Sequence, residues 1–379
     1  MPTIILQGCT ATPLGAYLKA LGVLRIVSEQ ADSEARGWWD GDTFTLESHF
    51  CEAELLDFFM ERYDPTPIVA PWNGASGFYP KDNREGIDAI AATEGARFQD
   101  YRETIEKCRN FPEVQAGKQK NDDERRSTIL RRSRNELSDR VVEWLDAAVG
   151  IAANGDRSFA PVLGTGGNEG HLDYTNNFMS RIAALLVSPD RKTPVRELLT
   201  NAVLGRPASG LQKGAAGQYD PGRAGGPNQG PGIEADAQTN PWNLVLTLEG
   251  AVAWASGLYR RQGVQYGSFL CSPFTVKSTE VGYGSASSKP EAREARAEIW
   301  TPLWTRSVLY GELRVLLREG RADISARPAR NTLEFAVAVA SLGTDRGIDR
   351  FVHFPVRLQP IPIGARSSTS RSNCTVLDS

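Results

Sequence analysis

The stretch TPLGAYLKALGVLRIV at residues 12–27 predicts a helix. Its apolar residues recur at helical spacing from Leu14 onward. Thr12 and Pro13 are typical of a helix start, because a hydroxyl can cap the first N–H groups and a proline ring presets φ. The run carries two basic residues and is too short to cross a bilayer. We therefore expect a core-facing helix and no membrane anchor.

The composition predicts an ordinary globular protein. The chain has 379 residues, of which 40% are hydrophobic and 23% are charged, and this length can bury a sizeable core. The net charge of -3 excludes a histone-like coat, so any contact with nucleic acid has to be local. Five scattered cysteines without the two-residue spacing of zinc or redox sites favour a reduced, cytoplasmic location. They are Cys9, Cys51, Cys108, Cys271 and Cys374.

Helical apolar spacing recurs along the chain, whereas β-like segments are short. No alternation of strand and helix appears, so we expect a helix-rich α+β fold with several core-facing helices, short β pieces and long glycine-rich loops. Further helices are predicted at Glu52–Tyr63, Glu136–Val149, Asn177–Val187, Asn240–Ala255, Ser307–Glu319 and Asn331–Leu342, and strands at Thr3–Leu6, Thr43–Leu46 and Glu298–Trp304.

The sharpest change in composition lies at residues 205–240, where nine glycines and four prolines leave little to bury. Such a long loop is either functional or a solvated linker. We therefore divide the chain into a helix-rich α+β domain at 1–204, a Gly/Pro-rich loop or linker at 205–239, a second α+β region at 240–358, and a disordered or aberrant tail at 359–379.

The motif LGTGGNEGHLDYTNNFM at residues 163–179 places glycines before a predicted helix, which could suit a phosphate. It lacks the lysine and hydroxyl of a nucleotide-hydrolysing loop, and no strand precedes it as in a dinucleotide site. His171 and Asp173 have no nearby histidine or cysteine to complete a metal site. We therefore expect no cofactor, no metal and no catalytic residue.

The same motif is rich in neutral hydrogen-bonding groups. Asn168, Asn176 and Asn177 can each donate and accept, and Gly166 and Gly167 allow the backbone to approach a partner closely. Base edges and phosphates are bound by such groups. The alternative, left open here, is that the glycines only form turns and Asn176 only caps the next helix.

Three other stretches combine polar side chains with glycines. APWNGASGFYPKDN at residues 70–83 interleaves aromatic rings, which could stack on bases, with amides and a lysine. Its alternative is a tryptophan packed under a glycine turn. The glycine-rich segment 205–240 and the segment 272–289 offer cations and amides for a polyanion. Together they supply the candidates Trp72, Asn73, Lys81, Lys213, Gln218, Arg223 and Lys277.

Taken in order, these stretches resemble the large subunit of the type I-G (formerly I-U) CRISPR effector complex, known as Cascade. The resemblance covers about residues 10–357. It is carried by LGTGGNEGHLDYTNNFM, APWNGASGF, KGAAGQYDPGRAGGPNQG with NPWNLVLTLEGA, GYGSAS with EARAEIWTPLW, and LGTDRGI. Members of the family are longer, so the resemblance implies a missing helical C-terminal part and a truncated or frame-shifted product.

The resemblance implies a non-catalytic subunit of an RNA-guided surveillance complex in antiviral defence. Its partners would be the subunits that carry crRNA, the target double-stranded DNA and the helicase-nuclease of the interference step, with no membrane. It would help recognise the motif that flanks the target (PAM) and stabilise the R-loop. Two alternatives remain: an architectural subunit without DNA contact, and a nucleotide-binding enzyme that uses the glycine-rich loop.

Overall fold

The computed structural model describes most of the chain, and the account below concerns those residues. They are 1–117, 123–151, 157–163, 174–190, 193–215, 219–220, 236–255, 257–260, 268–277, 297–320, 323–324, 327–329, 332–342, 347–359 and 373–376.

The fold is α+β and helix-rich, as predicted. Its α-helices are α1 (Leu14–Gln30), α2 (Glu52–Asp57), α3 (Glu85–Ala91), α4 (Gln99–Asn110), α5 (Pro112–Gln115), α6 (Asp123–Glu136), α7 (Asp139–Ala148), α9 (Tyr174–Ile182), α10 (Val195–Leu204), α11 (Pro241–Ala253), α13 (Tyr310–Glu319) and α14 (Thr332–Leu342). A π-helical turn continues α2 at Phe58–Arg62, another continues α9 at Ala183–Val187, and a 3-10 turn lies at Pro161–Leu163.

The strands form small antiparallel sheets. The first sheet has the order β1-β3-β2-β12 and the second β10-β11-β15-β16. Two-stranded pairs are β4 with β5, β6 with β7, β8 with β9, and β13 with β14. The bounds are β1 (Thr3–Thr10), β2 (Arg36–Asp40), β3 (Thr43–Glu47), β4 (Val149–Ile151), β5 (Arg157–Phe159), β6 (Gln212–Ala215), β7 (Asp236–Thr239), β8 (Gly257–Arg260), β9 (Ser268–Cys271), β10 (Thr275–Lys277), β11 (Ala297–Leu303), β12 (Val308–Leu309), β13 (Asp323–Ile324), β14 (Arg327–Pro328), β15 (Arg350–Gln359) and β16 (Asn373–Val376).

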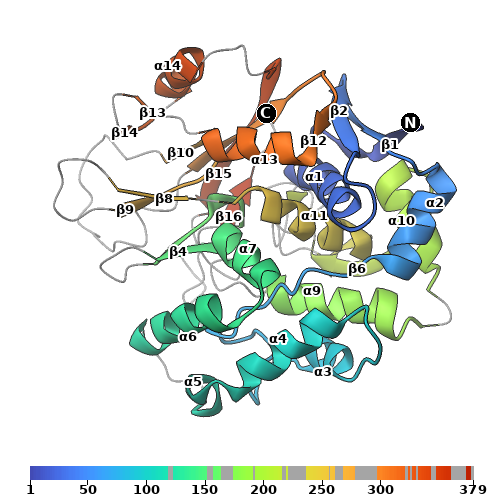
Figure 1. Ribbon diagram of the computed structural model, residues 1–379, viewed down its shortest axis with the longest axis vertical. Helices are drawn as coiled ribbons and strands as arrows, with labels where there is room; N and C mark the ends of the chain where they lie inside the picture. Colours follow the sequence, from blue (N-terminus) through green and yellow to red (C-terminus); the bar gives the residue numbers. More distant parts are fainter. Residues whose placement is uncertain are drawn as a thin grey trace.

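Helices α1 and α11 pack against each other at the centre of the molecule (Figure 1). They approach so closely that glycine is required where they touch. A Cβ atom on Gly250 would lie 1.7 Å from the carbonyl oxygen of Leu18, and one on Gly22 would lie 2.2 Å from that of Leu246. Real Cβ atoms do not reach such distances, so these two glycines determine the helix contact.

The first sheet lies against α1, and aromatic rings fill the space between them. The ring of Tyr17 on α1 stacks on Trp39 of β2, with centroids 5.2 Å apart. Trp304, which directly follows β11, donates its indole N–H to the carbonyl of Gly37 at 2.9 Å. The second sheet is therefore joined to the first where β11 ends.

Helices α3 to α6 form the lower part of the view in Figure 1, away from the two sheets. Helix α3 lies on α9, where a Cβ on Gly86 would come within 2.5 Å of the amide nitrogen of Ser180. The indole of Trp144 on α7 donates to the carbonyl of Val69 at 2.9 Å and meets the ring of Tyr174 edge-on. These contacts fix the segment before residue 72 against the start of α9.

Several predicted elements are confirmed, although some of them begin or end at residues other than those predicted. Helix α1 begins at Leu14, but its N-cap is Pro13 and Thr12 does not cap it, which corrects that detail. Asn240 caps α11 as predicted, because its side chain accepts the amide of Trp242 at 3.0 Å. The helix predicted at 177–187 begins at Tyr174. The helix predicted from Glu136 begins at Asp139, since Glu136 ends α6.

The predicted division of the chain stays a prediction, but its parts can be placed. The regions 1–204 and 240–358 share one hydrophobic core through α1 and α11. Within the expected linker 205–239, β6 and β7 pair with each other, and within the expected tail 359–379, residues 373–376 form β16. No helix in the described ranges is long and apolar enough to span a membrane.

Candidate functional site

The loop at residues 72–83, here the polar loop, is shaped by one carboxylate. Asp82 accepts the amide N–H of Ala75 at 3.0 Å through Oδ1, and those of Gly77 and Tyr79 at 3.0 and 3.2 Å through Oδ2. Ala75 has a φ of +87°, a conformation that costs an alanine roughly 1–2 kcal/mol relative to its usual regions. Three amides on one carboxylate hold this unfavourable backbone in place.

The polar loop meets the start of α9, and so two of the predicted stretches come together. The side-chain amide of Asn176 donates to the carbonyl of Asn83 at 2.9 Å. The other side of the contact is Gly77, where a Cβ would lie 3.3 Å from Oδ1 of Asn176. Asn176 therefore lies inside α9 and bridges to the loop, so the alternative interpretation, that it only caps this helix, is wrong.

The predicted DNA-facing residues on these two stretches are divided between buried and exposed positions. Trp72, Asn73 and Asn176 are buried, with exposed fractions of 2%, 6% and 8%. Lys81 and Asn177 are exposed. A ring as buried as that of Trp72 cannot stack on a base while the loop keeps this conformation.

The three buried residues nevertheless keep unused hydrogen-bonding atoms. In the part of the chain that the structure describes, Nε1 of Trp72, Nδ2 of Asn73 and Oδ1 of Asn176 are buried without a partner. Leaving such a group unpaired typically costs about 1–3 kcal/mol. Native proteins keep few such groups, and each one calls for an explanation such as a water, a ligand or a partner.

Two residues of this region were not singled out from the sequence. Asp82 was missed because an aspartate in a turn is common, and only its three amide contacts reveal its role. Arg125 at the start of α6 lies over the ring of Tyr79, 5.6 Å from its centroid, and donates to its hydroxyl at 3.2 Å. Burial raises the pKa of Tyr79 above its ordinary value, although Arg125 opposes this, so the hydroxyl remains a donor to the carbonyl of Pro71.

The other candidates cannot be assessed in the same way. Gly166, Gly167, Asn168, Gln218 and Arg223 lie outside the described residues, as do His171 and Asp173. Lys213 belongs to β6 and Lys277 to β10, but their side chains lie outside the description. Their predicted roles stay predictions.

A second polar cluster lies between α1, α11 and residues 63–66. Its centre is the ion pair of Arg25 and Glu249, whose N–O distance is 2.7 Å and whose side chains are almost fully buried. Burial disfavours the charged form of Arg25, but the carboxylates of Glu249 and Glu29 outweigh it and raise the pKa of Arg25. Burial, reinforced by Glu249, also raises the pKa of Tyr63 well above its usual value, so this phenol stays a neutral donor. Both oxygens of Glu249 are paired, which suits a structural role.

Within the described ranges, no group of three or more His, Cys, Asp and Glu side chains could hold a metal ion. Comparisons of the chain with protein-family models and with curated proteins found no match.

Proposed function

We propose that this chain is a non-catalytic, cytoplasmic subunit of an RNA-guided surveillance complex similar to the type I-G CRISPR effector. In this role it helps recognise the motif that flanks a DNA target and stabilises the R-loop. The proposal begins from the resemblance of five blocks of sequence, which occur in the order of that family's large subunit.

One structural observation supports the proposal more than any other. The polar loop and the start of α9 belong to two of the resembling blocks, and they meet through Asn176 and Asn83. At this junction buried polar atoms of Trp72, Asn73 and Asn176 have no partner in the described part of the chain. Once the loop opens, the N–H groups of Trp72 and Asn73 could donate to phosphates or base edges, and Oδ1 of Asn176 could accept from a base, so nucleic acid is a chemically suitable partner.

The exposed edge of the polar loop provides the test. In the assembled complex with crRNA, Lys81→Gln should weaken binding to duplex targets and reduce the slope of log affinity against log salt by about one, because one phosphate contact is lost. The matched control is Lys107→Gln, since Lys107 is an exposed lysine on α4. Equal affinities and slopes in the wild type and both variants would contradict DNA contact at this loop.

Two candidate residues whose side chains the structure does not describe, Asn168 and Lys213, allow a second test. Asn168→Ala should weaken binding mainly to targets with the correct flanking motif, whereas Lys213→Ala should weaken binding to all DNA alike. If both variants keep the wild-type affinity for every target, the assignment of these residues fails.

An architectural subunit without DNA contact is the second candidate, and the burial of Trp72, Asn73 and Asn176 favours it. Photocrosslinking of the assembled complex to target duplex distinguishes the two. Adducts on the peptide that contains Lys81 support DNA contact, and adducts confined to other subunits support the architectural role.

A further inference from the structure

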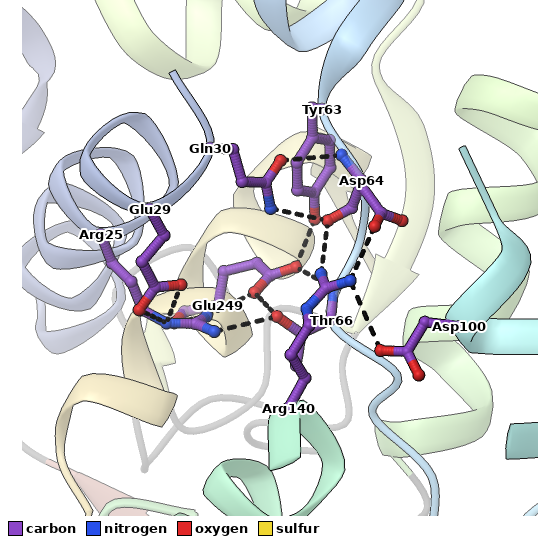
Figure 2. A network of polar contacts seen from close by, with 9 residues as sticks. All are labelled: Arg25, Glu29, Gln30, Tyr63, Asp64, Thr66, Asp100, Arg140 and Glu249. Atoms are coloured by element: carbon purple, nitrogen blue, oxygen red, sulfur yellow. Dashed lines mark hydrogen bonds and ion pairs between the residues drawn. The ribbon is translucent and has the colours of Figure 1, made fainter. Parts of the chain in front are cut away.

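The Glu249 carboxylate holds residues 63–66 as well as Arg25 (Figure 2). Its Oε1 accepts the hydroxyl of Tyr63 at 2.5 Å and the backbone amide of Thr66 at 2.9 Å. Its Oε2 accepts the hydroxyl of Thr66 at 2.6 Å and Nη1 of Arg25 at 2.7 Å. Three of these four hydrogen bonds come from the segment that leads towards the polar loop.

That segment, Tyr63–Pro71, is here called the strap. It has no regular secondary structure, and all of it except Asp64 is buried. Its carbonyls therefore need partners from elsewhere. Side chains provide several of them: Tyr101 donates to the carbonyl of Ile68 at 3.0 Å, and Tyr79 donates to that of Pro71 at 2.7 Å.

The start of the strap is held from its exposed side as well. Arg140 on α7 donates to the carbonyl of Asp64 at 2.8 Å and pairs with its carboxylate at 2.7 Å. Gln30 at the end of α1 exchanges two hydrogen bonds with the backbone of Asp64, at 2.8 and 2.9 Å. Figure 2 shows Gln30 reaching Asp64 from α1 and Arg140 reaching it from α7 at the bottom of the view.

We propose that Glu249, oriented by Arg25, is a positioning residue for the polar loop and acts on it through the strap. Asp82 gives the loop its shape, whereas Glu249 sets its location relative to α1 and α11. This coupling is a property of the fold and holds whether or not the loop binds nucleic acid.

The inference follows from the way in which the strap is bonded. A segment in a sheet is held by a ladder of equivalent hydrogen bonds, so the loss of one bond is shared along it. The strap has only scattered backbone hydrogen bonds, such as that of Ile68 to Thr66, and is otherwise held by individual side-chain contacts. Glu249 accepts three hydrogen bonds near its start. Loss of this carboxylate should therefore release the strap, and the loop that follows it, before the rest of the core opens.

Hydrogen-exchange mass spectrometry of the whole chain tests the proposal. Glu249→Gln keeps the size of the side chain but weakens its acceptors, and the peptide covering residues 72–83 should exchange roughly tenfold faster, as expected when hydrogen bonds to a charged group are lost. Thr66→Val, a milder change of similar shape, should accelerate exchange of the same peptide to a smaller extent. This second variant keeps the test decisive if Glu249→Gln fails to fold.

Two controls separate positioning from general destabilisation. Leu46→Ala leaves a cavity in the first sheet, away from the strap, and denaturant can be added to the wild type until its stability matches that of each variant. Under matched stability, faster exchange in the loop for Glu249→Gln and Thr66→Val alone supports the proposal. Equal acceleration in Leu46→Ala, or unchanged exchange in both strap variants, overturns it.

Discussion

The Arg25–Glu249 pair between α1 and α11 and the Trp72–Asn73 part of the polar loop are both buried and polar, but their polar groups are satisfied to different extents. Between the helices, Glu249 uses both carboxylate oxygens and Arg25 donates to three side chains. In the loop, Trp72 and Asn73 keep buried N–H groups without a partner in the described residues. The comparison teaches that burial alone does not reveal a role: the Arg25–Glu249 pair is satisfied and holds the fold, whereas the buried N–H groups of Trp72 and Asn73 retain capacity for a partner.

The variant with the largest expected loss of stability is Gly250→Ala, which tests the packing between α1 and α11. Its Cβ would overlap the carbonyl of Leu18 on a neighbouring helix, and backbone cannot move aside as a flexible side chain can. Overpacking usually costs about 1–3 kcal/mol, and because the clash here is with backbone we expect a loss above that range in the free energy of unfolding, measured by denaturant titration. The control is Gly311→Ala in α13, because a Cβ at Gly311 meets nothing within 4 Å, and this change should leave stability unchanged or raise it by up to about 1 kcal/mol. A loss below about 1 kcal/mol for Gly250→Ala would show that the helices are not packed this tightly.

The second test removes one member of the buried ion pair. Arg25→Ala leaves Glu249 buried and uncompensated, so we expect a loss of about 3–5 kcal/mol. Arg314→Ala is the matched control, because Arg314 pairs with Glu143 at 2.7 Å on the surface, where both side chains are about one-third exposed. That change should cost about 1 kcal/mol or less. Similar losses in the two variants would remove the distinction between core and surface pairs.

The third test examines the loop itself. Ala75→Gly relieves the positive φ of Ala75 and should stabilise the chain by up to about 1 kcal/mol, because glycine adopts this conformation without steric cost. Ala336→Gly in the exposed part of α14 should instead cost roughly 0.5–1 kcal/mol. Thermal unfolding of both variants measures the difference, and a loss of stability in both would argue against strain at Ala75.

The smallest expected effect concerns pH. Burial raises the pKa of Glu29 and of Asp64 above their usual values, although the neighbouring arginines oppose it. The folded chain therefore binds more protons than the unfolded chain in the window between the two pKa values of each group. The contribution of these two carboxyls to stability is fully present below their pKa in the unfolded chain. It is lost as the pH rises through their pKa in the folded chain. Glu29→Gln should reduce this fall in a series of unfolding midpoints from pH 4 to 7, and an unchanged slope would contradict the assignment.

The sequence predicted the central helices because their signals are local. The apolar spacing after Leu14 and the Asn-Pro pair at 240–241 depend only on neighbouring residues, and both helices are present. Helix α4 was missed because it is strongly polar, with only one side lined by the buried residues Tyr101, Thr104, Ile105 and Cys108.

The candidate site was harder to predict, because its geometry depends on contacts between distant parts of the chain. The amides of Asn73 and Asn176 look alike in the sequence, but only the folded chain shows that one is in the loop, the other inside α9, and that both are buried. Glu249 and Gly250 both lie within the block NPWNLVLTLEGA, which was read for its resemblance and its helix start. Nothing local marks a glutamate in an apolar helix as the partner of Arg25.

The pairing of Arg25 with Glu249 joins residues 224 positions apart. On a ribosome that adds about 5–20 residues per second, α1 emerges roughly 10–45 s before its partner helix exists. During that interval the apolar face of α1 has no native surface to cover it. Synthesis of this protein should therefore be sensitive to chaperones that shield nascent chains, and slowing translation between the two helices should lower the yield of folded protein.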